Sequence, residues 1–238
     1  MLKACHLHLF YQPNLHLGTH SLNEEETRHC LRVLRHQIGD QVHVTNGKGM
    51  IAKVLITSVN CKECYFEIIS NEKSDKKSFH QHLAIAPTKQ TERMEWFVEK
   101  ACELGVDEIS FIKTKNTERT KLKLDRLEKK TISALKQSKG SFKTILNPLI
   151  NFDTFIQNTR KNPRYIASVQ PELPHLITCL TPESHQIILI GPEGDFTSHE
   201  FGKALEKGYK PISLGEKILR TETAGIMSAM AVNLIHHY

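Results

Sequence analysis

The chain has 238 residues, of which 39% are hydrophobic and 24% charged, and its formal net charge is +6. This composition is typical of a globular protein and excludes a disordered or fibrous chain, and no apolar run approaches the ~18 residues of a membrane-spanning helix. Because residues 1–12 do not resemble a secretory signal and the 6 cysteines are scattered, we expect reduced thiols and a cytoplasmic protein.

The positive charge is concentrated in the middle of the chain. Residues 1–72 hold 7 basic and 7 acidic side chains, whereas residues 113–143 hold 11 basic and 3 acidic ones. A basic surplus of this density is what a polyanion such as nucleic acid binds. A solvent-exposed, lysine-rich helix would show the same surplus, so charge alone leaves both interpretations open.

Residues 1–72 predict a small β-rich domain with one early helix. Asn23 is a suitable N-cap before three glutamates, and we expect the helix to continue to Gly39. Asn46-Gly47 predicts a two-residue hairpin turn. The expected strands are Val42–Val44, Ala52–Ile56 and Tyr65–Ile69. Short strands with tight turns are typical of a small barrel.

Residues 71–80 predict an interdomain linker or long loop, and strands alternate with helices after it. The expected strands are His82–Ala86, Val106–Ile112, Tyr165–Val169, Ile187–Ile190 and Ile212–Leu214. The expected helices are Met94–Leu104 with Gly105 as its C-cap, Asp125–Ser138, a helix opened by the capping box Thr197–Glu200 and closed at Gly208, and Thr223–His236. This alternation indicates a parallel α/β sheet in residues 73–238.

The common nucleotide and metal motifs are absent from the sequence. Neither G-x-G-x-x-G nor G-x-x-x-x-G-K-[ST] occurs, and Gly47-Lys48-Gly49 lies in a hairpin turn with no helix after it. Cys61-x-x-Cys64 has no second pair at zinc spacing, although His80 and His82 are nearby candidates. A structural zinc site needs four ligands, and residues three apart on a strand point to opposite faces. We therefore expect no metal.

Two segments have the pattern of a ligand pocket, Ile187–Asp195 and Ser213–Ala224. Each leaves a predicted strand, crosses a glycine and leads toward a helix. In open α/β sheets, ligands bind outside the carboxyl ends of strands. The two segments together predict one pocket lined by main-chain groups, and two ordinary strand–helix turns are the alternative.

These segments and others in the same order resemble the SPOUT-class RNA methyltransferases, and specifically the ribosomal RNA small subunit methyltransferase E family. The motifs that carry the resemblance are His29-x-x-Arg32-Val33-Leu34-Arg35 with Gly39-Asp40, Lys89, Glu92-Arg93-Met94-Glu95-Trp96, Lys100-Ala101, Glu103-Leu104-Gly105-Val106, Glu118-Arg119-Thr120, Gln137-Ser138, Gly191-Pro192-Glu193-Gly194, Leu214-Gly215 and Ile218–Ala224. They span nearly the whole chain, and the last three are the most specific.

The resemblance implies both a fold and an activity. Residues 1–72 would form a PUA-like RNA-binding β-barrel domain, and residues 73–238 a SPOUT α/β domain with a deep trefoil knot. The protein would be a homodimer that transfers a methyl group from S-adenosylmethionine to N3 of a uridine in 16S ribosomal RNA of the small subunit. The alternatives are a SPOUT enzyme acting on another ribosomal or transfer RNA site, and a non-catalytic RNA-binding assembly factor.

The resemblance also implies site residues. Those expected to bind the cofactor are Leu189, Ile190, Gly191, Pro192, Glu193, Gly194, Leu214, Gly215, Ile218, Leu219, Arg220, Thr221, Thr223 and Ala224. The sulfonium methyl is already electrophilic, but the uridine imide must lose a proton, so the site must hold the base in line and stabilise negative charge on the ring. Arg220 is the candidate for that charge. Glu222 or Glu193 is the candidate proton acceptor, although either could instead hold a loop in place.

RNA binding would draw on both domains. The expected contacts are Arg28, Arg32, Arg35, Lys89, Arg93, Lys115, Arg119, Lys121, Lys123 and Lys139. Such phosphate contacts give affinity, while specificity requires the uridine to leave its stack. The sequence departs from the family at Gly140, where the family usually has arginine. Lys139 stands beside it, and lysine offers a point charge in place of a bidentate guanidinium.

Overall fold

The computed structural model describes residues 8–15, 20–60, 62–159, 163–182 and 185–237. Contacts between residues divide the chain into two compact units. The first consists of residues Met1–Lys76 and Ile132–Lys143, and the second of Lys77–Thr131 and Thr144–Tyr238. Within the described ranges, none of the helices combines the length and the apolar character needed to cross a membrane.

The first unit is built on a five-stranded sheet in the order β1-β3-β4-β5-β2. Its strands are β1 (Leu9–Tyr11), β2 (Ser21–Leu22), β3 (Gln41–Thr45), β4 (Met50–Val59) and β5 (Cys64–Lys73). β1 pairs with β3 in parallel, and the other pairs are antiparallel. Irregularities in the β4–β5 ladder after Lys53 and Ile56 bend the sheet, because a bulge increases local twist. The small β-barrel expected from the sequence is confirmed, and its sheet is nearly closed.

The early helix is shorter than the sequence predicts. The Asn23 side chain accepts a hydrogen bond from the Glu26 N–H at 2.9 Å, which confirms the N-cap. α1 (Glu24–Arg28) then passes into a π-helical turn, η1 (His29–Val33). The predicted end at Gly39 is wrong, because Arg35 adopts a left-handed φ of 59° that a continuing helix cannot contain.

Two further expectations for the first unit need correction. The loop between β3 and β4 has four residues instead of two, because the Asn46 side chain accepts hydrogen bonds from the N–H groups of Lys48 and Met50 and so organises a wider turn. The predicted linker is also shorter than residues 71–80, since β5 continues to Lys73 and the next strand begins at His80.

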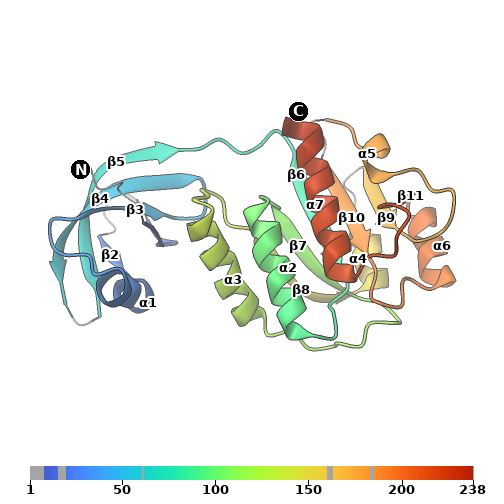
Figure 1. Cartoon of the computed structure of the whole chain (residues 1–238), viewed down its shortest axis with the longest axis horizontal. Coiled ribbons are helices and arrows are strands. Elements are labelled where there is room, and N and C mark those ends of the chain that lie inside the picture. Colours follow the sequence, from blue (N-terminus) through green and yellow to red (C-terminus); the bar gives the residue numbers. More distant parts are fainter. Residues whose placement is uncertain (1–7, 16–19, 61, 160–162, 183–184, 238) are drawn as a thin grey trace. The chain divides into compact units, whose positions relative to one another are not determined.

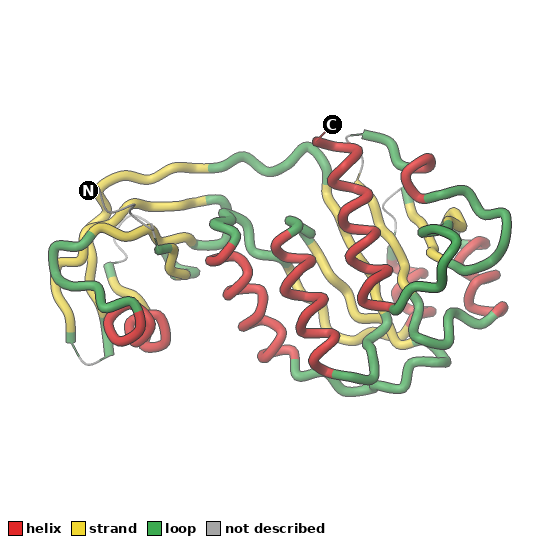
Figure 2. Tube along the Cα trace, in the orientation of Figure 1, coloured by secondary structure: helices red, strands yellow, loops and turns green. Residues whose placement is uncertain are grey.

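The second unit contains a six-stranded sheet in the order β11-β9-β10-β6-β7-β8 (Figures 1 and 2). Its strands are β6 (His80–Ile85), β7 (Glu108–Lys113), β8 (Ile145–Asn151), β9 (Arg164–Ala167), β10 (His185–Ile190) and β11 (Lys210–Ile212). The strand pairs of this sheet within the described ranges are parallel, which confirms the predicted parallel α/β architecture. The remaining helices are α2 (Thr91–Glu103), α3 (Leu124–Gln137), α4 (Phe152–Asn158), α5 (Leu176–Cys179), α6 (Ser198–Glu206) and α7 (Thr221–His237).

The central strands of this sheet, β6, β7 and β10, are buried on both faces. Along β10, Ile188 and Ile190 contribute to a core that includes residues of α2 and α7, while Ile187 and Leu189 contribute to a second core that includes residues of α4 and α6. Alternate side chains of a strand point to opposite faces, so one continuous apolar run supplies both cores. This arrangement leaves the carboxyl ends of the strands as the place where loops meet.

Gly225 allows α7 to pack closely against its neighbours. A Cβ built at Gly225 would collide with the Phe97 ring of α2 and lie 3.2 Å from Ile85 Cδ1. Since the site is buried and Phe97 is fully packed, we expect Gly225→Ala to lower the free energy of unfolding by about 1–3 kcal/mol, measured by denaturant unfolding. Gly202→Ala in α6 is the control, because no described heavy atom lies within 4 Å of its built Cβ. Equal losses of unfolding free energy in both variants would contradict the close packing of α7 against α2 at Gly225.

Candidate functional site

The carboxyl ends of β9, β10 and β11 border a cavity of about 200 Å³. Both segments singled out in the sequence lie along it, one after β10 and one after β11. The residues that line it are Ala167, Ser168, Val169, Ile190, Gly191, Pro192, Glu193, Asp195, Leu214, Gly215, Lys217, Ile218, Leu219, Thr221 and Ala224. The structure therefore brings together two segments that residues 196–212 separate in the sequence.

Hydrogen bonds hold the two loops in place. The Thr221 hydroxyl, at the start of α7, donates to the Gly191 carbonyl at 3.0 Å and so ties one loop to the other. The Gly215 N–H donates to Ser213 Oγ at 3.1 Å. Gly215 has a φ of +128°, which residues other than glycine rarely adopt. Asp195 closes the first loop by donating its N–H to the Pro192 carbonyl at 2.9 Å. The cavity walls are thus fixed backbone turns.

Most of the residues expected to bind a cofactor line this cavity, but four do not. Leu189 is buried in the second core, while Gly194, Arg220 and Thr223 are exposed outside the cavity lining. Five lining residues are not among those expected to bind the cofactor, namely Ala167, Ser168, Val169, Asp195 and Lys217, and of these Asp195 and Lys217 belong to the two segments predicted to form the pocket. The carboxyl end of the predicted strand Tyr165–Val169 could have identified the first three, since parallel strands end at the same edge.

The three candidate catalytic residues occupy different environments. Arg220 is exposed immediately before α7, and Glu193 is exposed in the cavity wall, where its Oε1 accepts a hydrogen bond from the Lys89 N–H at 3.4 Å. Glu222 is buried, with only 6% of its surface exposed. Its Oε1 lies 3.6 Å from Arg93 Nε, and its Oε2 has no hydrogen-bond partner in the described part of the chain.

A second group of contacts joins the loops that follow β6, β7 and β10. Arg119 donates from Nε to the carbonyls of Thr88 and Lys89, each at 3.1 Å. Asn116, which the sequence analysis did not select, donates from Nδ2 to the carbonyls of Gly194 and Asp195, each at 3.0 Å. The Arg119 side chain thus has a structural role between loops, beside the expected role in RNA binding.

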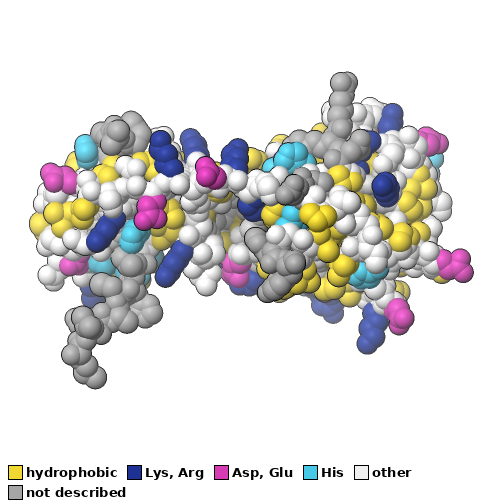
Figure 3. All heavy atoms as spheres, turned by 90° about the horizontal axis from the view of Figure 1, so that it is seen from above, with side chains coloured by type: hydrophobic (Ala, Val, Ile, Leu, Met, Phe, Trp, Pro, Cys, Tyr) yellow, Lys and Arg dark blue, Asp and Glu magenta, His cyan; other side chains and the backbone are white. Residues whose placement is uncertain are grey.

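Some of the ten cationic side chains expected to contact RNA already form ion pairs or hydrogen bonds within the protein, and others do not. Lys89 pairs with Glu118 at 2.9 Å, and the hydrogen bond with that carboxylate raises the pKa of the Lys89 ammonium. Arg28 pairs with Glu24 at 3.4 Å. The remaining exposed members are Arg32, Arg35, Lys115, Lys121, Lys123 and Lys139. Figure 3 shows Lys and Arg side chains at several separate places on the visible face.

The described residues contain no group of three or more His, Cys, Asp and Glu side chains that could hold a metal ion. Cys61 of the C-x-x-C pair lies outside the described residues, and Cys64 is buried in the core of the first unit. His82 was one of the candidate metal ligands, and its Nε2 lies within hydrogen-bond distance of Ser110 Oγ, at 2.8 Å.

Comparison with protein families adds independent evidence. A family model described as an RNA methyltransferase domain matches residues 75–233, and one described as an RNA methyltransferase PUA domain matches residues 22–69. The Ribosomal RNA small subunit methyltransferase E of Buchnera aphidicola (from Acyrthosiphon pisum) is 28% identical over 94% of this chain and 91% of its own. The protein of the same name from Bacillus subtilis is 25% identical over 90% of each chain.

Solved structures show the same similarity. The probable rRNA-methyltransferase from Porphyromonas gingivalis is 38% identical, with a TM-score of 0.90 over 97% of this chain and 99% of that one. The Ribosomal RNA small subunit methyltransferase E from Neisseria gonorrhoeae, solved bound to S-adenosyl methionine, is 27% identical, with a TM-score of 0.88 over 97% of this chain and 98% of that one. A methyltransferase from Legionella pneumophila, solved in complex with the bound cofactor SAM, is 26% identical to this chain. Its TM-score is 0.87, and the match covers 96% of this chain and 97% of that one.

Proposed function

Because the chain belongs to the ribosomal RNA small subunit methyltransferase E family, we propose that it transfers a methyl group from S-adenosylmethionine to N3 of a uridine in 16S ribosomal RNA. The observation that carries this proposal is the cavity at the carboxyl ends of β9, β10 and β11. It is lined by most of the positions that the family resemblance assigns to the cofactor. Two of the solved relatives hold S-adenosylmethionine.

The composition of the cavity fits this cofactor. Ile190, Leu214 and Leu219 supply apolar wall suited to a flat base, and the fixed turns supply main-chain donors and acceptors. The charged lining residues are two carboxylates, Glu193 and Asp195, and one ammonium group, Lys217. This excess of negative charge favours a ligand with positive centres, such as the sulfonium and amino groups of S-adenosylmethionine. When bound, the cofactor supplies an electrophilic methyl group.

Space for the target nucleotide lies beside the cofactor cavity. A second cavity of about 640 Å³ shares Val169, Gly215, Lys217 and Ile218 with the first. A uridine that has left its stack would enter there, and the binding walls would hold its N3 toward the methyl group. Contacts with RNA phosphates would supply affinity without choosing the base.

The chain's own residues must remove the imide proton and stabilise the charge that develops. Arg220, at the amino end of α7, would stabilise negative charge on the uracil ring. Glu193 lines the cavity and would accept the N3 proton directly or through water. Glu222 is buried beside Arg93, so we assign it a positioning role at the start of α7.

The proposed function also includes a homodimer with a trefoil knot in residues 73–238, working in the cytoplasm. Met227, Met230 and Leu234 support the dimer, because they recur at helical spacing on α7 and are 43%, 45% and 39% exposed. A face of exposed apolar side chains on one helix is favourably covered by a second copy. For the knot, the supporting observation is that the hydrogen bond from Thr221 to Gly191 ties the two C-terminal loops together.

The proposed function is tested by mapping modified nucleotides in 16S ribosomal RNA from cells that lack this protein. We expect one N3-methyluridine to disappear and to return when the gene is restored. An unchanged map would contradict the proposed target and favour another RNA. Calorimetric titration of the purified protein with S-adenosylmethionine is the second readout. Absence of binding heat would contradict the enzyme and favour a non-catalytic RNA-binding protein.

A further inference from the structure

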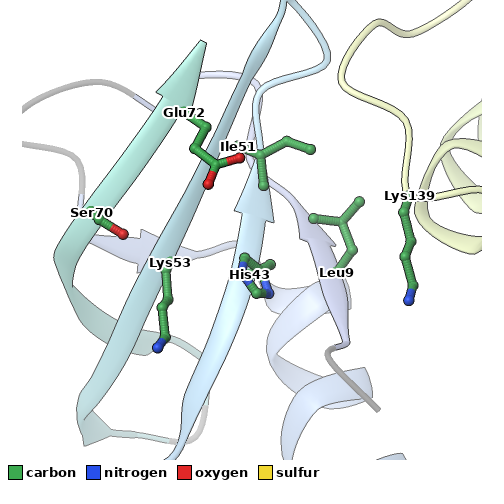
Figure 4. A pocket seen from close by; sticks show the side chains of 7 residues that line it. All are labelled: Leu9, His43, Ile51, Lys53, Ser70, Glu72 and Lys139. Atoms are coloured by element: carbon green, nitrogen blue, oxygen red, sulfur yellow. The ribbon is translucent and has the colours of Figure 1, made fainter. Parts of the chain in front are cut away.

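One face of the sheet in the first unit carries a straight row of side chains. Residues that are opposite each other in register on neighbouring strands project to the same face. The row across β1, β3, β4 and β5 consists of Leu9, His43, Lys53 and Ser70, each in register with the next. Ile51 and Glu72 form a second registered pair, two positions further along β4 and β5. All six therefore share one face, as Figure 4 shows.

This face is the outer one. The alternate positions, among them Val42, Val44, Ala52 and Val54, are buried in the core of the first unit. Leu9 is only 8% exposed although it does not belong to that core. It forms part of the lining of a cavity of about 270 Å³. We call this cavity the sheet pocket, and it is lined by Leu9, His43, Ile51, Lys53, Ser70, Glu72 and Lys139.

Lys139 completes the sheet pocket from outside the sheet. It follows α3 and belongs to the same unit, which includes Ile132–Lys143. Its left-handed φ of 56° ends the helix and turns the chain at this point. Backbone hydrogen bonds fix the segment after it to the sheet, from the Gly49 N–H to the Ser141 carbonyl at 2.8 Å and from the Lys143 N–H to the Gly47 carbonyl at 2.9 Å.

The sheet pocket combines apolar surface with excess positive charge. Leu9 and Ile51 supply apolar surface, and the charged lining groups are the two ammonium groups of Lys53 and Lys139 and the single carboxylate of Glu72. Neither Lys53 nor Lys139 makes an ion pair with any residue in the described ranges. Burial lowers the pKa of His43, and the charges of Lys53 and Lys139 lower it further against the opposing effect of Glu72. These effects favour the neutral form of the His43 imidazole.

We propose that the sheet pocket binds one nucleotide of a single-stranded RNA segment. Its phosphate would lie near Lys53 and Lys139, and its base would contact Leu9, Ile51 and the flat face of His43. Ser70 and Glu72 would accept hydrogen bonds from the base edge. A simple anion would leave the apolar surface unused. Unpaired bases, in contrast, are bound by stacking surfaces combined with cations. The cavity volume of about 270 Å³ lies just below the ~300–1,000 Å³ range of small-molecule sites, which suits one nucleotide and not a longer segment.

This inference rests on the proposed function in that RNA is the substrate, and it is tested first with free nucleotides. The probes are the four nucleoside 5′-monophosphates, their nucleosides and inorganic phosphate, added to the full chain with isotopically labelled histidines. We expect the monophosphates to shift the His43 signal and to raise its pKa, because a bound phosphate offsets the field of the two lysines. His43→Gln identifies the signal. An unchanged His43 signal, or equal binding of inorganic phosphate and nucleotides, would overturn the proposal.

The second test uses a single-stranded RNA oligonucleotide and the salt dependence of its binding. Each lost phosphate contact should reduce the slope of log K against log salt by about 0.7, so we expect this change for Lys53→Ala and for Lys139→Ala. Lys62→Ala is the matched control, since Lys62 is exposed in the β4–β5 turn and does not line the sheet pocket. Equal changes in all three variants would indicate general attraction and overturn the proposal. Binding of S-adenosylmethionine by the unaltered chain is measured separately, so failure of the proposed function would be recognised independently.

Discussion

Raising the salt concentration from about 50 to 200 mM is expected to weaken binding of the protein to small-subunit RNA by about 10³-fold, because each phosphate neutralised by Lys or Arg releases bound counterions. The number of cationic side chains free to contact phosphate determines how strongly the RNA affinity falls with salt. Of the ten predicted contacts, four have other partners, namely Arg28, Lys89, Arg93 and Arg119. The six that remain exposed correspond to the lower end of the roughly 10³–10⁵ range for 6–10 phosphate contacts.

The measurement is the affinity for small ribosomal subunits at a series of salt concentrations and constant pH. Six contacts predict a slope of log K against log salt of about −5. Titration with S-adenosylmethionine under the same conditions is the control, and its affinity should change far less because this ligand is not a polyanion. An RNA affinity that is insensitive to salt would show that the exposed cations do not contact phosphate.

Local signals in the sequence predicted local structure well. The N-cap at Asn23 and the capping box from Thr197 to Glu200 are both present, because a side chain that satisfies the first free N–H groups acts within a few residues. The C-cap of α2 is Leu104, one residue before the predicted Gly105, and Gly105 follows it with the left-handed φ of +74° that commonly ends a helix. The alternation of strands and helices likewise predicted the parallel sheet, since parallel strands require crossover connections.

Features set by distant contacts could not be predicted in the same way. Sheet order is one example, because β9 lies between β10 and β11 although it follows β8 in the chain. This order brings Ala167, Ser168 and Val169 to the cavity. The basic block of residues 113–143 is another, since its last part, Ile132–Lys143, belongs to the first unit and the rest to the second. Charge counted along the chain could not show this division.

The candidate site was predicted in outline but not in the roles of its acidic residues. The two glycine-containing loops could be recognised because the backbone turns needed beside a ligand restrict the residue types. Glu193 and Glu222 were equivalent candidates in the sequence. The structure distinguishes their surroundings, since Glu193 lines the cavity whereas Glu222 is buried beside Arg93. That pairing depends on how α7 packs on α2, which no local pattern encodes.

Replacement of Arg220 by alanine should lower kcat for methyl transfer by about 10²- to 10³-fold, the usual effect of removing one group that stabilises transition-state charge. The dissociation constant for S-adenosylmethionine should change little. Arg220 is exposed, precedes α7 and does not line the cofactor cavity, whereas its neighbours Leu219 and Thr221 do. Because the guanidinium is exposed next to these lining residues, we expect it to contact a base that enters beside the cofactor.

The two quantities are measured separately, kcat with radiolabelled S-adenosylmethionine and small subunits at saturation, and cofactor affinity by calorimetry. Arg220→Lys is the matched variant, because it keeps the charge but loses the planar donor geometry, so its kcat should fall between those of the alanine variant and the unaltered chain. Because the side chain is exposed, a folding defect is not expected. Equal losses of cofactor affinity and kcat in Arg220→Ala would mean that Arg220 shapes the cofactor site, and the charge on the uracil ring would then have to be stabilised by another group.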